Sequence, residues 1–196
     1  MRRFLVAAVT AGVVVGLAAA PASAQTKTRK DKVGDAPARV DIRSVKVQNN
    51  SANFAVTVRV ANVTKRKTSA VVFFGTPSGK AGTKNLVSFE TIPVSKGRYK
   101  FAATKVDADG QASEFTCAGA GVTIKGGANG YFRVKVPQSC LGADAGTQRT
   151  QVFTYDKQEA KGQQQSGRLL RGDEGAGAGD DISSDTLRTP ITTRRG

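Results

Sequence analysis

Two cysteines are the residues of this chain whose spacing most directly suggests chemistry. Cys117 and Cys140 lie in the stretch FTCAGAGVTIKGGANGYFRVKVPQSCL, on either side of a glycine-rich turn over residues 126–130. A redox pair is more often close in sequence, as in Cys-x-x-Cys, and two thiols alone make a poor metal site. The strand-like flanks of the turn can fold back as a hairpin and bring the two cysteines together. We therefore predict a structural disulfide, worth on the order of 3 kcal/mol in the chain-entropy model.

Enzymatic chemistry has few candidate residues in this chain. It contains no histidine, which removes the usual general base, the usual zinc ligand and every triad that needs imidazole. There is no Gly-x-Ser-x-Gly elbow and no phosphate-binding P-loop. Glu90 and Glu114 are the only glutamates between Gln25 and Asp156, and no pattern places them near each other. We predict a protein that is not an enzyme and has no cofactor; a carboxylate-dependent hydrolase acting on cell-wall material is the alternative.

Three aspartates near a glycine raise the question of calcium. Asp31, Asp35 and Asp41 surround Gly34, and carboxylates at such a turn can supply the oxygen ligands that calcium requires. The favoured interpretation is structural, because Asp35 precedes Pro37 in a turn and Asp41 opens a strand-like segment. No metal site is predicted, with calcium at these aspartates as the open alternative.

The first 24 residues have the layout of a cleavable secretory signal. Arg2 and Arg3 precede an apolar run over residues 4–20, and Ala22-Ser23-Ala24 forms a small-residue cleavage site. We expect cleavage after Ala24 and a secreted, extracellular protein; an uncleaved membrane anchor is the alternative. Export favours the disulfide, because thiols outside the cytoplasm are not kept reduced.

The chain is strongly basic, and its charge is unevenly distributed. The whole chain carries a net charge of +15, and loss of the two leader arginines leaves +13. Residues 25–156 hold 21 basic and nine acidic residues, whereas residues 157–196 hold seven and six. Such a charge attracts polyanions through its long-range field, although it equally serves solubility. The expected partner is an anionic cell-wall polymer or a membrane surface.

Seven basic residues form the predicted polyanion-binding clusters. They are Lys27, Arg29, Lys30 and Lys32 near the mature N-terminus, and Lys65, Arg66 and Lys67 in one loop. Recognition of bases would need aromatic platforms, and the chain has no tryptophan. We therefore expect non-specific binding of polyanions, no specific nucleic acid, and a monomer.

The elements that must position these residues read as short strands. Alternation of apolar and polar residues is clearest over 54–61 and 131–136, and turn signals separate the other segments. Without convincing helical periodicity, the pattern predicts an all-β fold, a single small antiparallel sandwich of about seven to eight strands over residues 40–156. A barrel is the alternative architecture.

Two flanking segments differ from this body in composition. Residues 25–39 are polar and basic without periodicity, which predicts a flexible arm. Residues 157–196 are of low complexity and lack the apolar residues that offset ordering entropy, so we expect them to be mostly disordered. Within them, residues 186–193 recover β character and predict a return to an edge strand.

Two short motifs carry a family resemblance. They are DKVGDAPARVDIRSVKV, beginning at Asp31, and Cys-x-Gly-x-x-Val with Val-Pro-x-Ser-Cys-Leu, which contain the two cysteines. They resemble small secreted actinobacterial proteins whose first strands are similar to DOMON-like and carbohydrate-binding β-sandwiches, over roughly residues 31–156. The resemblance implies fold and export rather than an activity. Haem-binding DOMON relatives use residues that are not found here, since histidine is absent, and sugar-binding relatives use aromatic platforms for which only Tyr99, Tyr131 and Tyr155 are candidates.

These observations together predict a secreted, non-enzymatic protein of the cell surface or extracellular space that binds anionic polymers. A purely structural surface protein is a further alternative to the hydrolase.

Overall fold

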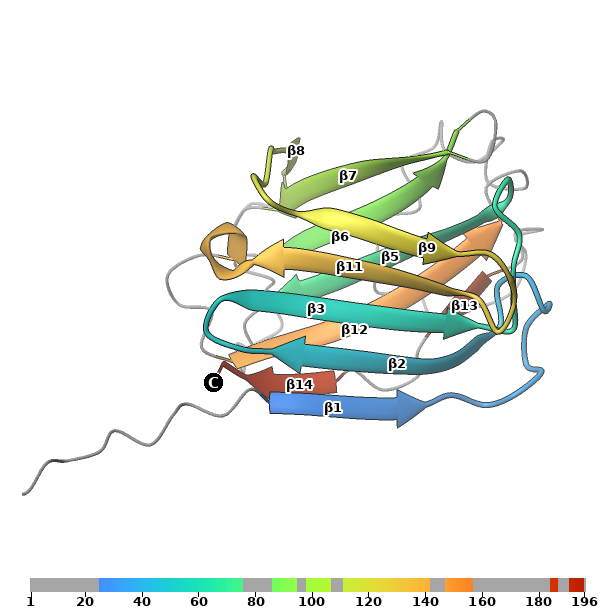
Figure 1. Cartoon of the computed structure of the whole chain (residues 1–196). Coiled ribbons are helices and arrows are strands. Elements are labelled where there is room, and N and C mark those ends of the chain that lie inside the picture. The colour runs from blue at the N-terminus through green and yellow to red at the C-terminus, as the bar shows by residue number, and fades with distance from the viewer. Residues whose placement is uncertain are drawn as a thin grey trace, which may run out of the picture.

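The chain folds into antiparallel β-sheets that pack face to face (Figure 1). The computed structural model describes residues 25–75, 86–94, 98–106, 111–141, 147–156, 184–186 and 191–195. The described strands do not close into a barrel. The all-β sandwich predicted from the sequence is therefore confirmed, but the described residues form more strands than the seven to eight expected.

The first sheet has five strands in the order β1-β2-β3-β11-β9. Their bounds are Gln25–Lys30 for β1, Ile42–Asn49 for β2, Asn53–Val60 for β3, Tyr131–Pro137 for β11 and Gly121–Lys125 for β9. All four neighbouring pairs are antiparallel. In Figure 1 this sheet lies toward the viewer.

The second sheet lies behind the first and has the order β13-β12-β5-β6-β7-β8, with β14 also paired to β12. Its strands are Thr68–Gly75 (β5), Leu86–Pro93 (β6), Tyr99–Val106 (β7), Ala112–Glu114 (β8), Thr147–Asp156 (β12), Ser184–Thr186 (β13) and Ile191–Arg194 (β14). A short ladder between β4 (Asn62–Val63) and β10 (Gly127–Ala128) closes one end of the first sheet.

The core lies between the sheets because strand alternation turns the apolar side chains of both inward. In the first sheet, β3 and β11 place Phe54, Val56 and Val58 opposite Val136, Val134 and Phe132, and all six side chains are buried. The second sheet contributes Val72, Phe89 and Val152 among others. The polar residues between these positions therefore face outward and are available to solvent or to a ligand.

The two cysteines form the predicted disulfide. The sulfur atoms of Cys117 and Cys140 are 2.02 Å apart, and no free cysteine is present among the described residues. The bridge joins the segment before β9 to a 3-10 turn over Gln138–Leu141 that follows β11. Since β9 and β11 are paired antiparallel, the hairpin predicted between the cysteines is also confirmed.

The structure corrects the expected flexible arm in part. Gln25–Lys30, the first six residues of the segment 25–39, form β1 and pair along their full length with β2. The local sequence gave no sign of this strand, because five of its six residues are exposed and no apolar alternation is present. Pairing with the edge of β2, rather than burial of side chains, orders it.

The return to a strand that was expected over residues 186–193 is seen in part, since residues 187–190 lie outside the described residues. Ile191–Arg194 form β14, where Ile191 and Thr193 are buried. Asn49 donates a hydrogen bond of 3.5 Å from its side-chain amide to the hydroxyl of Thr193, and Gln138 donates one of 2.7 Å to the side-chain oxygen of Asn49. These buried contacts fasten the last strand to the first sheet. Residues 157–183, expected to be disordered, lie outside the described residues.

Candidate functional site

The aspartates considered for calcium do not gather in the structure. No group of three or more carboxylates, cysteines or histidines suited to a metal is found among the described residues. Asp41 is buried and instead holds the local chain: its Oδ2 accepts a hydrogen bond of 3.0 Å from the backbone of Gly34 and lies 3.3 Å from Nη2 of Arg43. Gly34 has a φ of 80°, so this turn uses a conformation that glycine adopts readily.

The two glutamates considered for catalysis are separated by a strand. Glu90 lies on β6 and Glu114 on β8, and β7 lies between them. Glu90 accepts a hydrogen bond from the hydroxyl of Tyr155, which is buried. Burial and the neighbouring Glu90 both raise the pKa of the Tyr155 hydroxyl. Glu114 is exposed at the sheet edge. The structure does not bring these carboxylates together on adjacent strands.

The charges of the two sheets differ sharply. The five strands of the first sheet contain nine Lys and Arg residues and no Asp or Glu. The strands of the second sheet contain four basic residues and four acidic residues. Among the strands that the structure describes, the positive charge therefore belongs to one layer of the sandwich.

Six of these nine cations share the outward face of the first sheet, which we call the cationic face. They are Lys30, Lys46, Arg59, Lys125, Arg133 and Lys135, and all six are exposed. Residues paired across antiparallel strands point to the same side of a sheet. The pairing of Lys46 with Thr57, and of Thr57 with Arg133, therefore places two of the cations on this side, away from the buried valines.

The register arranges this face in rows. One row across the five strands reads Lys30, Ser44, Arg59, Tyr131, Lys125, and the next reads Thr28, Lys46, Thr57, Arg133, Thr123. A third row, Thr26, Gln48, Ala55, Lys135, Gly121, holds a single cation. No ion pair among the described residues involves any cation of the face. Their charge is available to a ligand.

One aromatic ring accompanies these cations. Tyr131 is half-buried on the cationic face, and the guanidinium carbon of Arg59 lies 5.8 Å from the centre of its ring. A guanidinium over an aromatic face is held by the ring quadrupole, which limits the orientations of Arg59. The hydroxyls of Thr28, Thr57 and Thr123 lie in the neighbouring row. The face thus combines fixed positive charge with hydrogen-bond donors.

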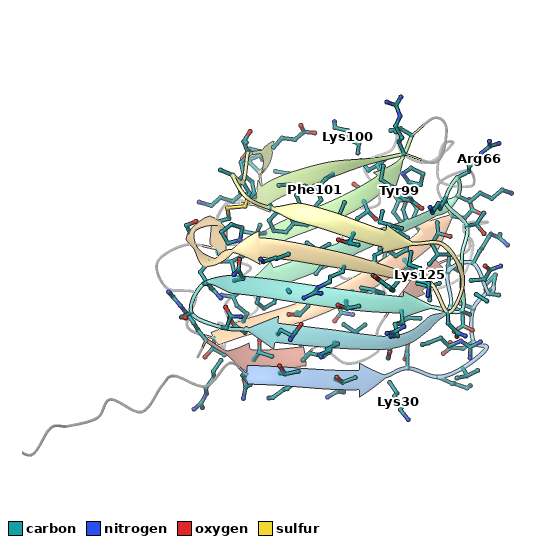
Figure 2. All side chains as sticks on the ribbon, viewed as in Figure 1. Lys30, Arg66, Tyr99, Lys100, Phe101 and Lys125 are labelled. Atoms are coloured by element: carbon teal, nitrogen blue, oxygen red, sulfur yellow. A yellow bond between two sulfur atoms is a disulfide. The ribbon has the colours of Figure 1, made fainter. Side chains whose placement is uncertain are left out.

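The basic residues predicted from the sequence are divided among four places. Lys30 joins the cationic face, and Lys27 and Arg29 line a groove of about 300 Å³ between β1 and β14, together with Thr28, Ile191 and Thr192. Lys32 is exposed in the turn after β1, and Lys65, Arg66 and Lys67 are exposed in the turn after β4. Figure 2 shows Lys30, Lys125 and Arg66 at the same end of the sandwich.

The side chain of Lys65 packs against Gly126, a residue without a side chain of its own. A Cβ atom built on Gly126 would lie 2.9 Å from Cε of Lys65, so the stem of Lys65 lies directly over this residue. Gly126 follows Lys125, the last residue of β9, so Lys65 packs against the chain just beyond the end of that strand.

Sequence reasoning missed five members of the cationic face: Lys46, Arg59, Lys125, Arg133 and Lys135. Each alternates with buried or half-buried residues in its strand, which is the signal of an outward position. Single cations spaced along alternating strands do not form a run in the sequence, whereas Lys65-Arg66-Lys67 does. Their proximity arises from strand order.

Comparisons with family models, curated proteins and solved structures found no match to the chain. Among the described residues, no helix is long and apolar enough to cross a bilayer. The site must therefore be interpreted from its own geometry.

Proposed function

We propose that this protein is exported and binds anionic polymers at the cell surface, without catalysis, through the cationic face. The observation that carries the proposal is the separation of charge between the sheets: nine cations and no carboxylate in one, four of each in the other. Charge needed only for solubility has no reason to gather in one layer. Concentrated on one face, it gives a directed field toward a polyanion.

The disulfide and the leader-like first 24 residues support export. The Cys117–Cys140 bridge suits an oxidising compartment. The expected leader lies outside the described residues, so its support comes from sequence alone. N-terminal sequencing of protein recovered from culture medium tests this part; a chain that begins at Gln25 is the expected result, and retention of Met1 would contradict it.

Binding to purified cell-wall material tests the ligand class. We expect the protein to co-sediment with wall fractions at low salt and to be released as salt rises from about 0.05 to 0.5 M, because salt screens such contacts. The triple variant Lys46→Gln, Arg59→Gln, Arg133→Gln should lose most of this binding. The matched control, Arg98→Gln, Lys100→Gln, Lys105→Gln, removes the same charge from exposed positions at or on β7 of the other sheet.

Three results would contradict the proposal: binding that does not respond to salt, absence of binding, or equal loss in the two triple variants.

The competing hypothesis of a carboxylate-dependent hydrolase has a separate test. Release of soluble wall fragments by the intact protein, abolished in Glu90→Gln or Glu114→Gln, would favour the enzyme over the binding protein.

A further inference from the structure

The cations of the cationic face follow one another from strand to strand. Lys30 on β1, Lys46 on β2, Arg59 on β3, Arg133 on β11 and Lys125 on β9 provide one cation on each strand, in the order in which the strands lie. Successive members alternate between the first and second rows of the face. They form a zigzag that crosses the whole sheet at right angles to its strands, and we call these five residues the track.

The spacing of the track follows from sheet geometry. Neighbouring strands lie about 4.8 Å apart, and residues on one face of a strand repeat every 6.8 Å or so. Successive track cations are therefore separated by about 8 Å at their backbones, and the track spans about 19 Å from Lys30 to Lys125. Figure 2 labels these two ends. No strand offers a line of comparable length, because β11, the richest, has only Arg133 and Lys135 on this face.

The distribution of charge distinguishes a linear ligand from a flat one. Beyond the track, the face has one further cation, Lys135, and the other members of its row are neutral. A flat anionic membrane would contact cations at any position on the face, so a surface that binds membranes is expected to carry cations over its whole area. A band that is two rows wide and crosses every strand instead matches a chain of anions.

We infer that the ligand is a linear polyanion that lies across the strands along the track. This inference rests on the proposed function and adds to it the shape and direction of the ligand. It also implies a minimum length, because a chain shorter than the track cannot contact all five cations at once.

Titration with linear inorganic polyphosphates of defined length tests the inference. We expect affinity to rise with chain length until the extended chain reaches about 19 Å, and then to change little per added phosphate. Vesicles of phosphatidylglycerol and phosphatidylcholine provide the flat alternative, and we expect them to bind at least tenfold more weakly than the long chains at equal phosphate concentration.

Single variants test the direction of the ligand. Lys46→Gln and Arg59→Gln each remove one track cation, and each should reduce the slope of log affinity against log salt by about 0.7, as expected for one lost contact to a flexible chain. Lys135→Gln removes an equal charge from the same face away from the track and should reduce the slope by less than half as much. Lys100→Gln, on the other sheet, controls for net charge, and circular dichroism controls for folding.

The outcomes separate the two claims. Equal effects of Lys46→Gln and Lys135→Gln, or affinity that keeps rising well beyond the track length, would overturn the track while leaving salt-dependent polyanion binding intact. Tighter binding to anionic vesicles than to long polyphosphate would overturn the linear ligand in favour of a membrane surface. If neither probe nor wall material binds, the proposed function fails as well.

Discussion

At the scale of single residues, the cationic face avoids the usual penalty of crowded charge. Like charges directly opposite one another on neighbouring strands are destabilising. Lys46 lies opposite Thr28 and Thr57, and Arg133 lies opposite Thr57 and Thr123, so each has only neutral partners in its row. Threonine is also favoured in strands. The alternation lets the sheet carry many cations without placing any two in direct opposition.

Tyr99 shows how the core limits ionisation. Its hydroxyl donates a hydrogen bond of 3.4 Å to the backbone oxygen of Thr68. Its ring packs edge-on against the ring of Phe132, and the two ring centroids are 5.8 Å apart. Burial raises the pKa of Tyr99 to about 12, because the phenolate is poorly solvated there.

This shift predicts a loss of stability in alkali. The raised pKa means that the folded protein keeps the Tyr99 proton between pH 10 and about 12 while the unfolded chain releases it. The free energy of unfolding should therefore be unaffected by Tyr99 below pH 10 and fall as pH rises to about 12, by on the order of 1 kcal/mol after allowance for partial exposure. Urea unfolding across this range, compared with Tyr99→Phe, isolates this effect from the titration of lysines. An identical pH dependence in the variant would contradict it.

At the scale of elements, the turn between β9 and β11 sets the position of one end of the track. Gly127 and Asn129 have positive φ angles of 86° and 53°, and Gly130 is buried where the chain enters β11. The backbone nitrogen of Gly130 donates to the oxygen of Gly127, and its own oxygen accepts from Val60 at the end of β3. This turn holds Tyr131 between Lys125 on one side and Arg59 on the other.

Gly130 should tolerate no side chain. A Cβ atom there would lie 2.5 Å from the backbone oxygen of Lys125 and 2.8 Å from Cβ of Val63. We expect Gly130→Ala to destabilise the protein by about 1–3 kcal/mol, since the clashing backbone must move. Gly121→Ala on the same strand pair is the control, because no atom lies within 4 Å of its Cβ position, and it should change stability by less than about 0.5 kcal/mol. Equal melting temperatures for the two variants would contradict this interpretation of the turn.

At the scale of the whole molecule, the disulfide and the Lys125 end of the track lie at opposite ends of the β9–β11 hairpin. Cys117 precedes the start of β9 and Cys140 follows the end of β11, whereas Lys125 and Tyr131 lie at the turn between the strands. The disulfide closes a loop with a sequence separation of 23 residues. Its contribution is therefore to stability, and the track is held by the sheet itself.

Removal of the disulfide separates these two roles. The double variant Cys117→Ala, Cys140→Ala should lower the free energy of unfolding by about 3 kcal/mol, measured by chemical denaturation. Its folded fraction should bind long polyphosphate within about twofold of the native affinity, because the bridge lies at the end of the hairpin away from Lys125. Thiol titration of the native protein provides the control: two reactive thiols would show that the bridge does not form.

The sequence predicted much of this architecture from local patterns. Alternation over 54–61 and 131–136 identified β3 and β11, and the spacing of Cys117 and Cys140 around a glycine-rich turn identified both the hairpin and the bridge. It missed β1, since an edge strand held by backbone pairing needs no apolar pattern. Sequence analysis also assigned polyanion binding to runs of basic residues such as Lys65-Arg66-Lys67, whereas the cations of the cationic face stand singly in their strands.

The sequence by itself determined the fold class, the disulfide and the excess of positive charge, because these follow from composition and from neighbours within a few residues. The tertiary structure alone decided where that charge lies. Strand order β1-β2-β3-β11-β9 brings Lys30, Lys46 and Arg59 beside Arg133 and Lys125, more than 60 residues further along the chain. Long-range pairing between strands sets this order, and no local pattern encodes it.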